Sequence, residues 1–112
     1  MILTSFFEYL PESVSHNEKI QKHVLIRRGK VANMTQLARA VFPPGESVEP
    51  HAHPDMVELF MVRSGMALFS VSNEQYELKK DDCIVIEPGE IHEVKNNHQD
   101  VLILDYFGLQ AD

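Results

Sequence analysis

The fold is decided by the stretch Gly45-Glu-Ser-Val-Glu-Pro-His51-Ala-His53-Pro-Asp-Met-Val-Glu58-Leu-Phe-Met-Val-Arg-Ser-Gly65. Two histidines and one glutamate stand in it at fixed distances between two glycines, in the pattern G-x5-H-x-H-x4-E-x6-G. Imidazole nitrogens and a carboxylate oxygen together form a ligand set for a divalent transition metal. The stretch therefore indicates a large part of a metal site.

A second segment, Gly89-Glu-Ile-His92-Glu-Val-Lys-Asn96, supplies another histidine in the pattern G-x2-H-x3-N. In this order and at this separation, the two segments resemble the signature motifs of the cupin superfamily. The resemblance implies a small jelly-roll barrel, or double-stranded β-helix. It also implies that one metal ion is bound by His51, His53, Glu58 and His92. The second motif departs from the family pattern at Glu87, which replaces a proline, and at Asp81, which replaces a glycine but tolerates a left-handed backbone.

The length and charge of the chain restrict its organisation and its partners. Its 112 residues suit a single domain over residues 1–112, since domains most often hold roughly 100–150 residues. The net charge of −7 opposes contact with nucleic acid or an anionic membrane, because both require basic patches. One cysteine, no signal-peptide pattern and no apolar run of roughly 20 residues together predict a cytoplasmic protein.

Short runs rich in β-branched and aromatic residues, separated by turn signals, predict an all-β chain. The expected strands span residues 23–28, 34–42, 57–62, 66–72, 75–78, 83–86, 91–95 and 101–107. Strands at this spacing are typical of a sandwich or barrel, and the barrel is expected over roughly 34–107. Residues 1–22 are predicted to form an irregular or partly helical arm packed on the body, because Ile2, Phe6 and Leu10 recur at helical spacing.

Side-chain alternation supports the convergence of the four candidate ligands. His51 and His53 are two residues apart, so on one strand both imidazoles would project from the same face. Glu58 is expected on the adjoining antiparallel strand among apolar residues, where an uncompensated carboxylate is costly. His92 is expected to begin a later strand that barrel closure brings opposite the first pair. This set suits a divalent Fe, Mn, Ni, Co or Zn ion and leaves one or two coordination positions open.

Other residues are candidates for lesser roles around the site. Cys83 is not at a ligand position and is predicted to be a buried strand thiol. The remaining histidines, which are predicted to lie at the surface, are His16, His23 and His98. Asp55 or Glu93 could accept a hydrogen bond from a ligand imidazole.

A pocket beside the metal site is expected to include Met56, Phe60 and one of Gln36 and Arg39. The last two have opposite parity on their strand, so only one points inward, and alternation alone does not say which. The chain contains no Ser/His/Asp order, glycine-rich phosphate loop or zinc-knuckle cysteines that would indicate another chemistry.

Two functions of different classes fit these features. The resemblance implies a metal-dependent enzyme, either a dioxygenase or a sugar or uronate isomerase, acting on a small oxygenated metabolite. The alternative is a non-catalytic cupin that binds or senses a small ligand. We favour the enzyme, because an open metal site is chemically competent, although no catalytic residue is assigned. A homodimer is also expected, through Ile2, Leu3, Phe6 and Phe7 or through Val101–Phe107, because a small barrel has sheet edges to cover.

Overall fold

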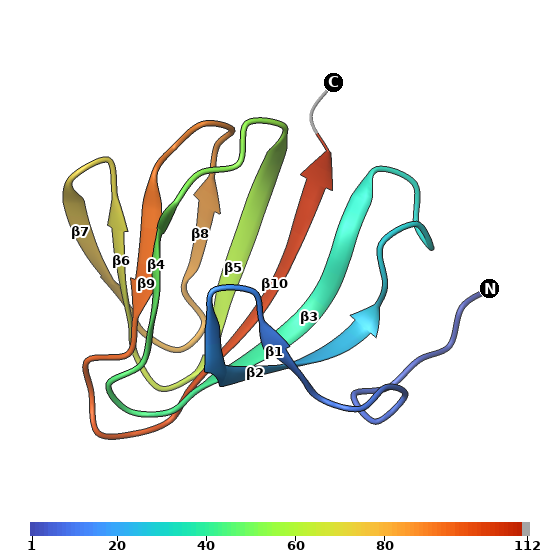
Figure 1. Ribbon diagram of the computed structural model, residues 1–112, viewed down its shortest axis with the longest axis horizontal. Helices are drawn as coiled ribbons and strands as arrows, with labels where there is room; N and C mark the ends of the chain where they lie inside the picture. Colours follow the sequence, from blue (N-terminus) through green and yellow to red (C-terminus); the bar gives the residue numbers. More distant parts are fainter. Residues whose placement is uncertain (111–112) are drawn as a thin grey trace.

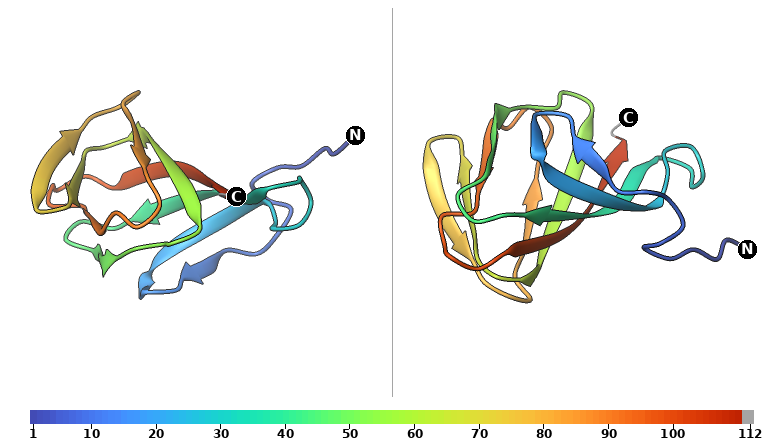
Figure 2. Two further views of the ribbon diagram at one scale, coloured as in Figure 1. Left: turned by 90° about the horizontal axis from the view of Figure 1, so that it is seen from above. Right: turned by 60° about the horizontal axis from the view of Figure 1, so that its bottom comes forward.

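The chain folds into two facing β-sheets that curve around a common interior (Figure 1, Figure 2). This computed structural model describes residues 1–110, so the last two residues of the predicted domain 1–112 lie outside it. No helix long and apolar enough to cross a membrane occurs between residues 1 and 110. The strands of the described chain are β1 (Glu12–Val14), β2 (Asn17–Ile26), β3 (Met34–Phe42), β4 (Ser47–His51), β5 (Met56–Ser64), β6 (Ala67–Val71), β7 (Glu74–Leu78), β8 (Cys83–Ile86), β9 (His92–Lys95) and β10 (Leu102–Gln110).

The strand order confirms the predicted all-β jelly-roll class. One sheet has six strands in the order β1-β2-β3-β10-β5-β8, and the other has four in the order β4-β9-β6-β7. All pairings are antiparallel. The last strand, β10, lies between β3 and β5 at the centre of the larger sheet. Hydrogen bonds therefore join the C-terminal strand to two strands from the first part of the barrel.

The hydrophobic core lies between the two sheets and follows from strand alternation. On β10 the inward residues Leu102 and Leu104 are fully buried, and Leu104 pairs across the strands with Ala40 and Val62. The facing sheet contributes Phe69, whose ring centre lies 5.3 Å from the ring centre of a phenylalanine on β5, Phe60. Burying each large apolar side chain contributes roughly 1.5–3 kcal/mol.

The N-terminal region differs from the predicted arm over residues 1–22. Strands β1 and β2 form an antiparallel hairpin that extends the edge of the six-stranded sheet, and only residues 1–11 are irregular, without a helix. The inward positions of β2 are Ile20 and Val24, both fully buried, with Lys22 between them. That lysine interrupts the alternation of apolar and polar residues by which a strand is recognised in a sequence. The sequence pattern therefore did not predict the hairpin.

The first eleven residues lie beside the six-stranded sheet, as Figure 1 shows, and make specific contacts with it. The Phe6 ring lies 3.8 Å from the Arg39 guanidinium, which also binds Asp105 through two bonds of 2.6 and 3.0 Å. The Thr4 hydroxyl donates a 2.8 Å hydrogen bond to the Leu25 carbonyl. These contacts agree with the expectation that the arm packs on the body.

Two turn residues have a left-handed backbone, and one strand residue differs from its predicted burial. Asp81 has a φ of 75°, so an aspartate does occupy the left-handed position at which the family pattern has glycine. Gly65 has a φ of 83°, and a Cβ there would lie 2.5 Å from the Val101 carbonyl oxygen. Cys83, predicted to be buried, is exposed instead, because on the edge strand β8 it points outward while Ile84 and Ile86 point inward.

Candidate metal centre

The four predicted metal ligands come from both sheets. His51 ends β4 and His92 begins β9, and these two residues are paired across the neighbouring strands. Glu58 reaches the same place from β5, in the facing sheet. His53 lies in the loop between β4 and β5, where its carbonyl accepts a 2.8 Å hydrogen bond from the Gly89 amide. The two motif segments are therefore tied together at this point.

Two expectations about the local backbone were wrong, and one was confirmed. His51 and His53 do not share a strand, because β4 ends at His51 and the chain leaves the sheet. Glu58 is not on an adjoining strand, because the connection after β4 crosses to the facing sheet instead of forming a hairpin. His92 begins β9, as expected, and lies directly across from His51 on that neighbouring antiparallel strand.

The ligand atoms nevertheless converge. One nitrogen from each of the three imidazoles and one Glu58 oxygen all lie within 4.8 Å of one another. The Oε1 atom of Glu58 is 3.4 Å from Nε2 of His92 and 3.7 Å from Nε2 of His53. The side chain of His92 is only 1% exposed and that of Glu58 12% exposed. Polar atoms this well buried normally have hydrogen-bond partners.

Backbone carbonyls determine which imidazole nitrogens face the cluster. The Nδ1 atom of His51 is 2.9 Å from the Glu49 carbonyl oxygen, and Nδ1 of His92 is 3.0 Å from that of Glu90. A carbonyl oxygen only accepts, so each Nδ1 carries the proton and donates it. Each neutral ring then presents the lone pair of Nε2, as a metal ligand requires. Neither Asp55 nor Glu93 supplies this acceptor.

The two buried atoms at the centre of the cluster lack partners. Glu58 Oε1 and His92 Nε2 have no hydrogen bond in the structure, although both are shielded from solvent. With Nδ1 protonated, Nε2 is an acceptor, so two acceptors face each other across 3.4 Å. Such an arrangement is unfavourable unless a cation lies between them. The donor set and the unpaired atoms thus both fit a divalent metal ion, and the cluster could bind one.

The pKa values of two cluster histidines shift in opposite directions. Burial lowers the pKa of His51 below its usual value, against the opposing effect of the Glu49 carbonyl. Burial also acts to lower the pKa of His92, but the Glu58 carboxylate and the Glu90 carbonyl outweigh it, so the pKa is raised. The position between Glu58 and His92 therefore attracts positive charge, whether a proton or a metal cation.

A cavity of about 350 Å³ opens beside the cluster, lined by the inner face of the six-stranded sheet and by β4 and β9 of the facing sheet. The predicted lining residues Met56 and Phe60 are confirmed, and Gln36 is the inward member of the ambiguous pair. Arg39 points to the outer face, where it binds Asp105. A volume of this size accommodates a small metabolite.

Sequence reasoning missed several polar residues of the cavity lining, among them His16, Lys22 and Tyr106. His16 was predicted to lie at the surface and is exposed, but its ring centre is 5.1 Å from that of His51. Lys22 and Tyr106 could have been found by their parity. Each alternates with buried apolar residues on its strand, and a polar side chain at such a position faces the interior.

The remaining candidates lie away from the cluster. Asp55 is exposed, and Glu93 lies beside Lys95, 3.6 Å from its Nζ. His98 is 3.6 Å from Glu77 and does not line the cavity. Among the described residues, no hydrogen bond or ion pair joins these side chains to the four candidate ligands.

Asn96, the last position of the second motif, has a structural role. Its side chain is 1% exposed, and its amide donates hydrogen bonds of 3.0 Å to the Phe42 carbonyl and 2.9 Å to the Asp100 carbonyl. Its backbone amide donates to the Glu46 carbonyl at 3.0 Å, and its carbonyl accepts from Gly45 at 2.8 Å. Asn96 therefore joins the end of β3, the start of β4 and the end of β9.

Comparison with known proteins agrees with this architecture. An uncharacterised protein of Methanocaldococcus jannaschii is 35% identical over 60 residues, which is 54% of this chain and 48% of that protein. The chain thus spans about half the length of this curated relative.

Solved structures resemble the whole chain. The structure of a predicted oxalate decarboxylase from Thermotoga maritima has a TM-score of 0.88 at 21% identity, covering 97% of this chain and 99% of that chain. KdgF from Halomonas sp. has a TM-score of 0.81 at 19% identity, covering 100% and 96%. At these identities the likeness shows the fold alone. The family model of the cupin domain matches residues 38–107, more than half of the sequence, and the chain therefore belongs to the cupin family.

Proposed function

We propose that this cupin is a metal-dependent enzyme that acts on a small oxygenated metabolite. The observation that carries the proposal is the pair of buried acceptors, Glu58 Oε1 and His92 Nε2, which face each other without a hydrogen bond. A divalent ion held by these two residues and by His51 and His53 would satisfy both atoms. The adjoining cavity would let a small ligand reach it.

The chemistry divides between the ion and the side chains of the cavity. A bound ion would supply Lewis-acid chemistry at an oxygen of the ligand, or redox chemistry if it is iron. Burial raises the pKa of Tyr106, so its hydroxyl stays protonated at neutral pH and serves as a hydrogen-bond donor to the ligand. His16 lines the cavity and is exposed beside His51, so its imidazole is a candidate general acid or base.

Two reaction classes that the likeness to cupins implies are compatible with this arrangement, namely dioxygenation and isomerisation of a sugar or uronate. The structural relative from Thermotoga maritima is a predicted oxalate decarboxylase, which supports the inclusion of small carboxylates among the compounds tested. Binding of such a compound without turnover would instead indicate the non-catalytic, sensing role.

The experiment that tests the metal centre is elemental analysis of untagged protein by inductively coupled plasma mass spectrometry. We expect about one equivalent of Fe, Mn, Ni, Co or Zn per chain, and its loss in the double variant His51→Ala/His53→Ala. The matched control is His23→Ala/His98→Ala, which removes two histidines outside the cluster and should retain the metal. Absence of metal after purification and after reconstitution with each ion would refute the proposal.

The identity of the ion then selects the activity assay. Iron directs the search to substrate-dependent O₂ uptake, and the other ions direct it to isomerisation of sugars and uronates. A compound that stabilises the metal-loaded protein but is recovered unchanged would favour a binding protein. Turnover that disappears in the His51→Ala/His53→Ala variant would establish the enzyme.

A further inference from the structure

The cavity carries a charge opposite to that of the protein as a whole. The chain has a net charge of −7, yet two cationic residues, Lys22 and Arg28, line the cavity. Glu58 is the only carboxylate among the lining residues, and it faces the three imidazoles of the cluster. The part of the cavity away from the cluster is therefore a positively charged recess in an acidic protein.

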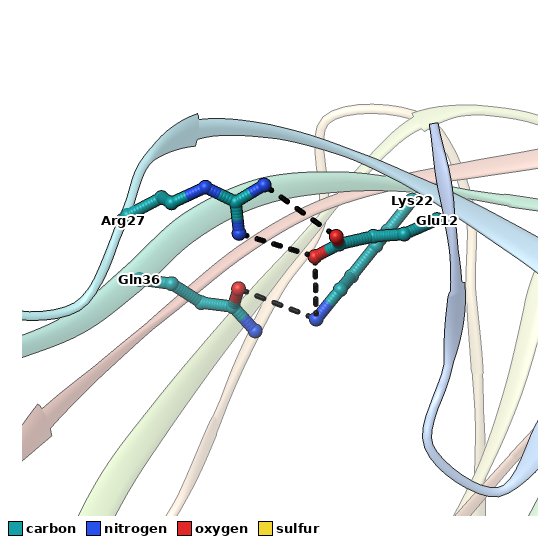
Figure 3. A network of polar contacts seen from close by, with 4 residues as sticks. All are labelled: Glu12, Lys22, Arg27 and Gln36. Atoms are coloured by element: carbon teal, nitrogen blue, oxygen red, sulfur yellow. Dashed lines mark hydrogen bonds and ion pairs between the residues drawn. The ribbon is translucent and has the colours of Figure 1, made fainter. Parts of the chain in front are cut away.

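Lys22 is held inside this recess by its strand. It lies on β2 between the buried residues Ile20 and Val24, and only 17% of its side chain is exposed. Its ammonium group has two long contacts, 3.7 Å to Glu12 Oε1 and 3.4 Å to Gln36 Oε1, both visible in Figure 3. Charge-assisted hydrogen bonds of an ammonium group are normally about 2.7–2.9 Å long, so neither contact satisfies it well.

The charges around Lys22 do not cancel. Figure 3 shows that Glu12 is shared with Arg27, which binds its two oxygens at 3.3 and 3.4 Å. The hydrogen bonds from Arg27 lower the pKa of Glu12, so the carboxylate stays ionised at neutral pH. Glu12 carries one negative charge and Lys22 and Arg27 carry one positive charge each, so these three side chains together have a net charge of +1. The positive excess is on the cavity side, because Lys22 lines the cavity and Arg27 does not.

Gln36 offers a second donor at the same place. Lys22 only donates, so the side-chain oxygen of Gln36 faces it, and the amide nitrogen of Gln36 remains available to a ligand. Both residues line the cavity. An ammonium group and an amide group side by side suit the two oxygens of a carboxylate.

We propose that Lys22 and Gln36 form an anion subsite that recognises a carboxylate of the ligand, while the oxygenated remainder of the ligand lies at the histidine–glutamate cluster. This inference rests on the proposed function, because it assigns a substrate class to the same cavity. The ligand is then an acid that carries further hydroxyl or carbonyl oxygens. A neutral molecule of the same shape would leave the half-buried ammonium group of Lys22 with only its two long contacts, to Glu12 and Gln36.

The test compares D-galacturonate with D-galactose, which have the same ring and differ in the carboxylate. Binding to metal-loaded protein is measured by isothermal titration calorimetry for the wild type, for Lys22→Gln and for the control Lys19→Gln. Lys19 lies on the same strand but is exposed and does not line the cavity, so its loss changes net charge equally. Thermal unfolding of each variant reports whether the fold is retained.

The subsite predicts that the wild type binds galacturonate at least tenfold more tightly than galactose, that Lys22→Gln removes this preference, and that Lys19→Gln keeps it. Equal binding of the two sugars by the wild type, or no binding of galacturonate at millimolar concentration, would overturn the subsite. So would an unchanged preference in Lys22→Gln. If that variant does not fold, the wild-type comparison in rising salt decides, since only the galacturonate affinity should fall.

Metal analysis of the same samples separates the two proposals. Protein that contains the metal but shows no preference for the acid retains the metal centre and loses the anion subsite. Protein that takes up no metal but still prefers galacturonate through Lys22 retains the subsite and loses the metal-dependent function.

Discussion

Replacement of Glu58 by glutamine should affect the metal-free and the metal-loaded protein in opposite directions. In the metal-free protein Glu58 Oε1 faces the Nε2 lone pair of His92 at 3.4 Å. A glutamine of the same shape can turn its amide toward that nitrogen and donate a hydrogen bond. At pH 9, well above the ordinary pKa of an imidazole, we expect Glu58→Gln to raise the metal-free stability by about 1 kcal/mol, the net worth of one hydrogen bond.

The metal-loaded protein should respond in the other sense, because the variant lacks the negative charge that binds the ion. At a metal concentration 100 times the dissociation constant, the wild type gains about 2.7 kcal/mol of stability. A tenfold weaker affinity in Glu58→Gln leaves a gain of about 1.4 kcal/mol at the same concentration. The metal-induced rise in Tm therefore falls from roughly 11 °C to roughly 6 °C, at about 4 °C per kcal/mol.

The assay is thermal unfolding with EDTA at pH 9 and with the native metal at pH 7.5. The control is Glu93→Gln, which makes the same charge change on the outward side of β9 and should leave both values close to wild type. A Glu58→Gln variant that is less stable than the wild type without metal, and equally stabilised by metal, would refute the reasoning. Glu58 would then be a structural residue and not a ligand.

Two further substitutions test the frame around the cluster, both by urea denaturation. Asn96→Ala removes three buried or partly buried side-chain hydrogen bonds and should lower the free energy of unfolding by about 2–3 kcal/mol, whereas the exposed Asn97→Ala should cost little. Gly65→Ala should cost at least about 2 kcal/mol, because its Cβ would meet the Val101 carbonyl at 2.5 Å and its φ is positive. Gly29→Ala has the same sign of φ but open space, so it should cost about 1 kcal/mol, and equal costs for the two glycines would contradict the packing argument.

The sequence could identify the cluster residues because a metal restricts residue type and spacing together. His51, His53, Glu58 and His92 do converge, although two of the three backbone arguments used for them concerned strands that do not form as expected. The predicted convergence does not depend on these strands, since a side chain can reach the same point from a strand end or from a loop. The convergence was therefore more predictable than the elements that produce it.

Long-range contacts decided what alternation left open. Parity allowed either Gln36 or Arg39 to face the cavity. Arg39 points outward because Asp105 on β10 and Phe6 in the N-terminal segment both contact its guanidinium there. Neither partner is near Arg39 in the sequence. The same limit applies to Cys83, whose exposure follows from the position of β8 at the edge of its sheet.

The residues that would choose a ligand lie partly outside the segment that identifies the family. The family model covers residues 38–107 and includes all four cluster residues, but Lys22, Gln36 and His16 precede it. They are brought to the cavity by the hairpin β1–β2 and by the start of β3. Membership of the family thus predicts the four ligand residues at the metal end of the cavity. It predicts nothing about the side chains at the opposite end. A chain that kept the motifs but exchanged Lys22 for an acidic residue should retain the metal and reject a carboxylate ligand, so specificity can change without any change in the cluster.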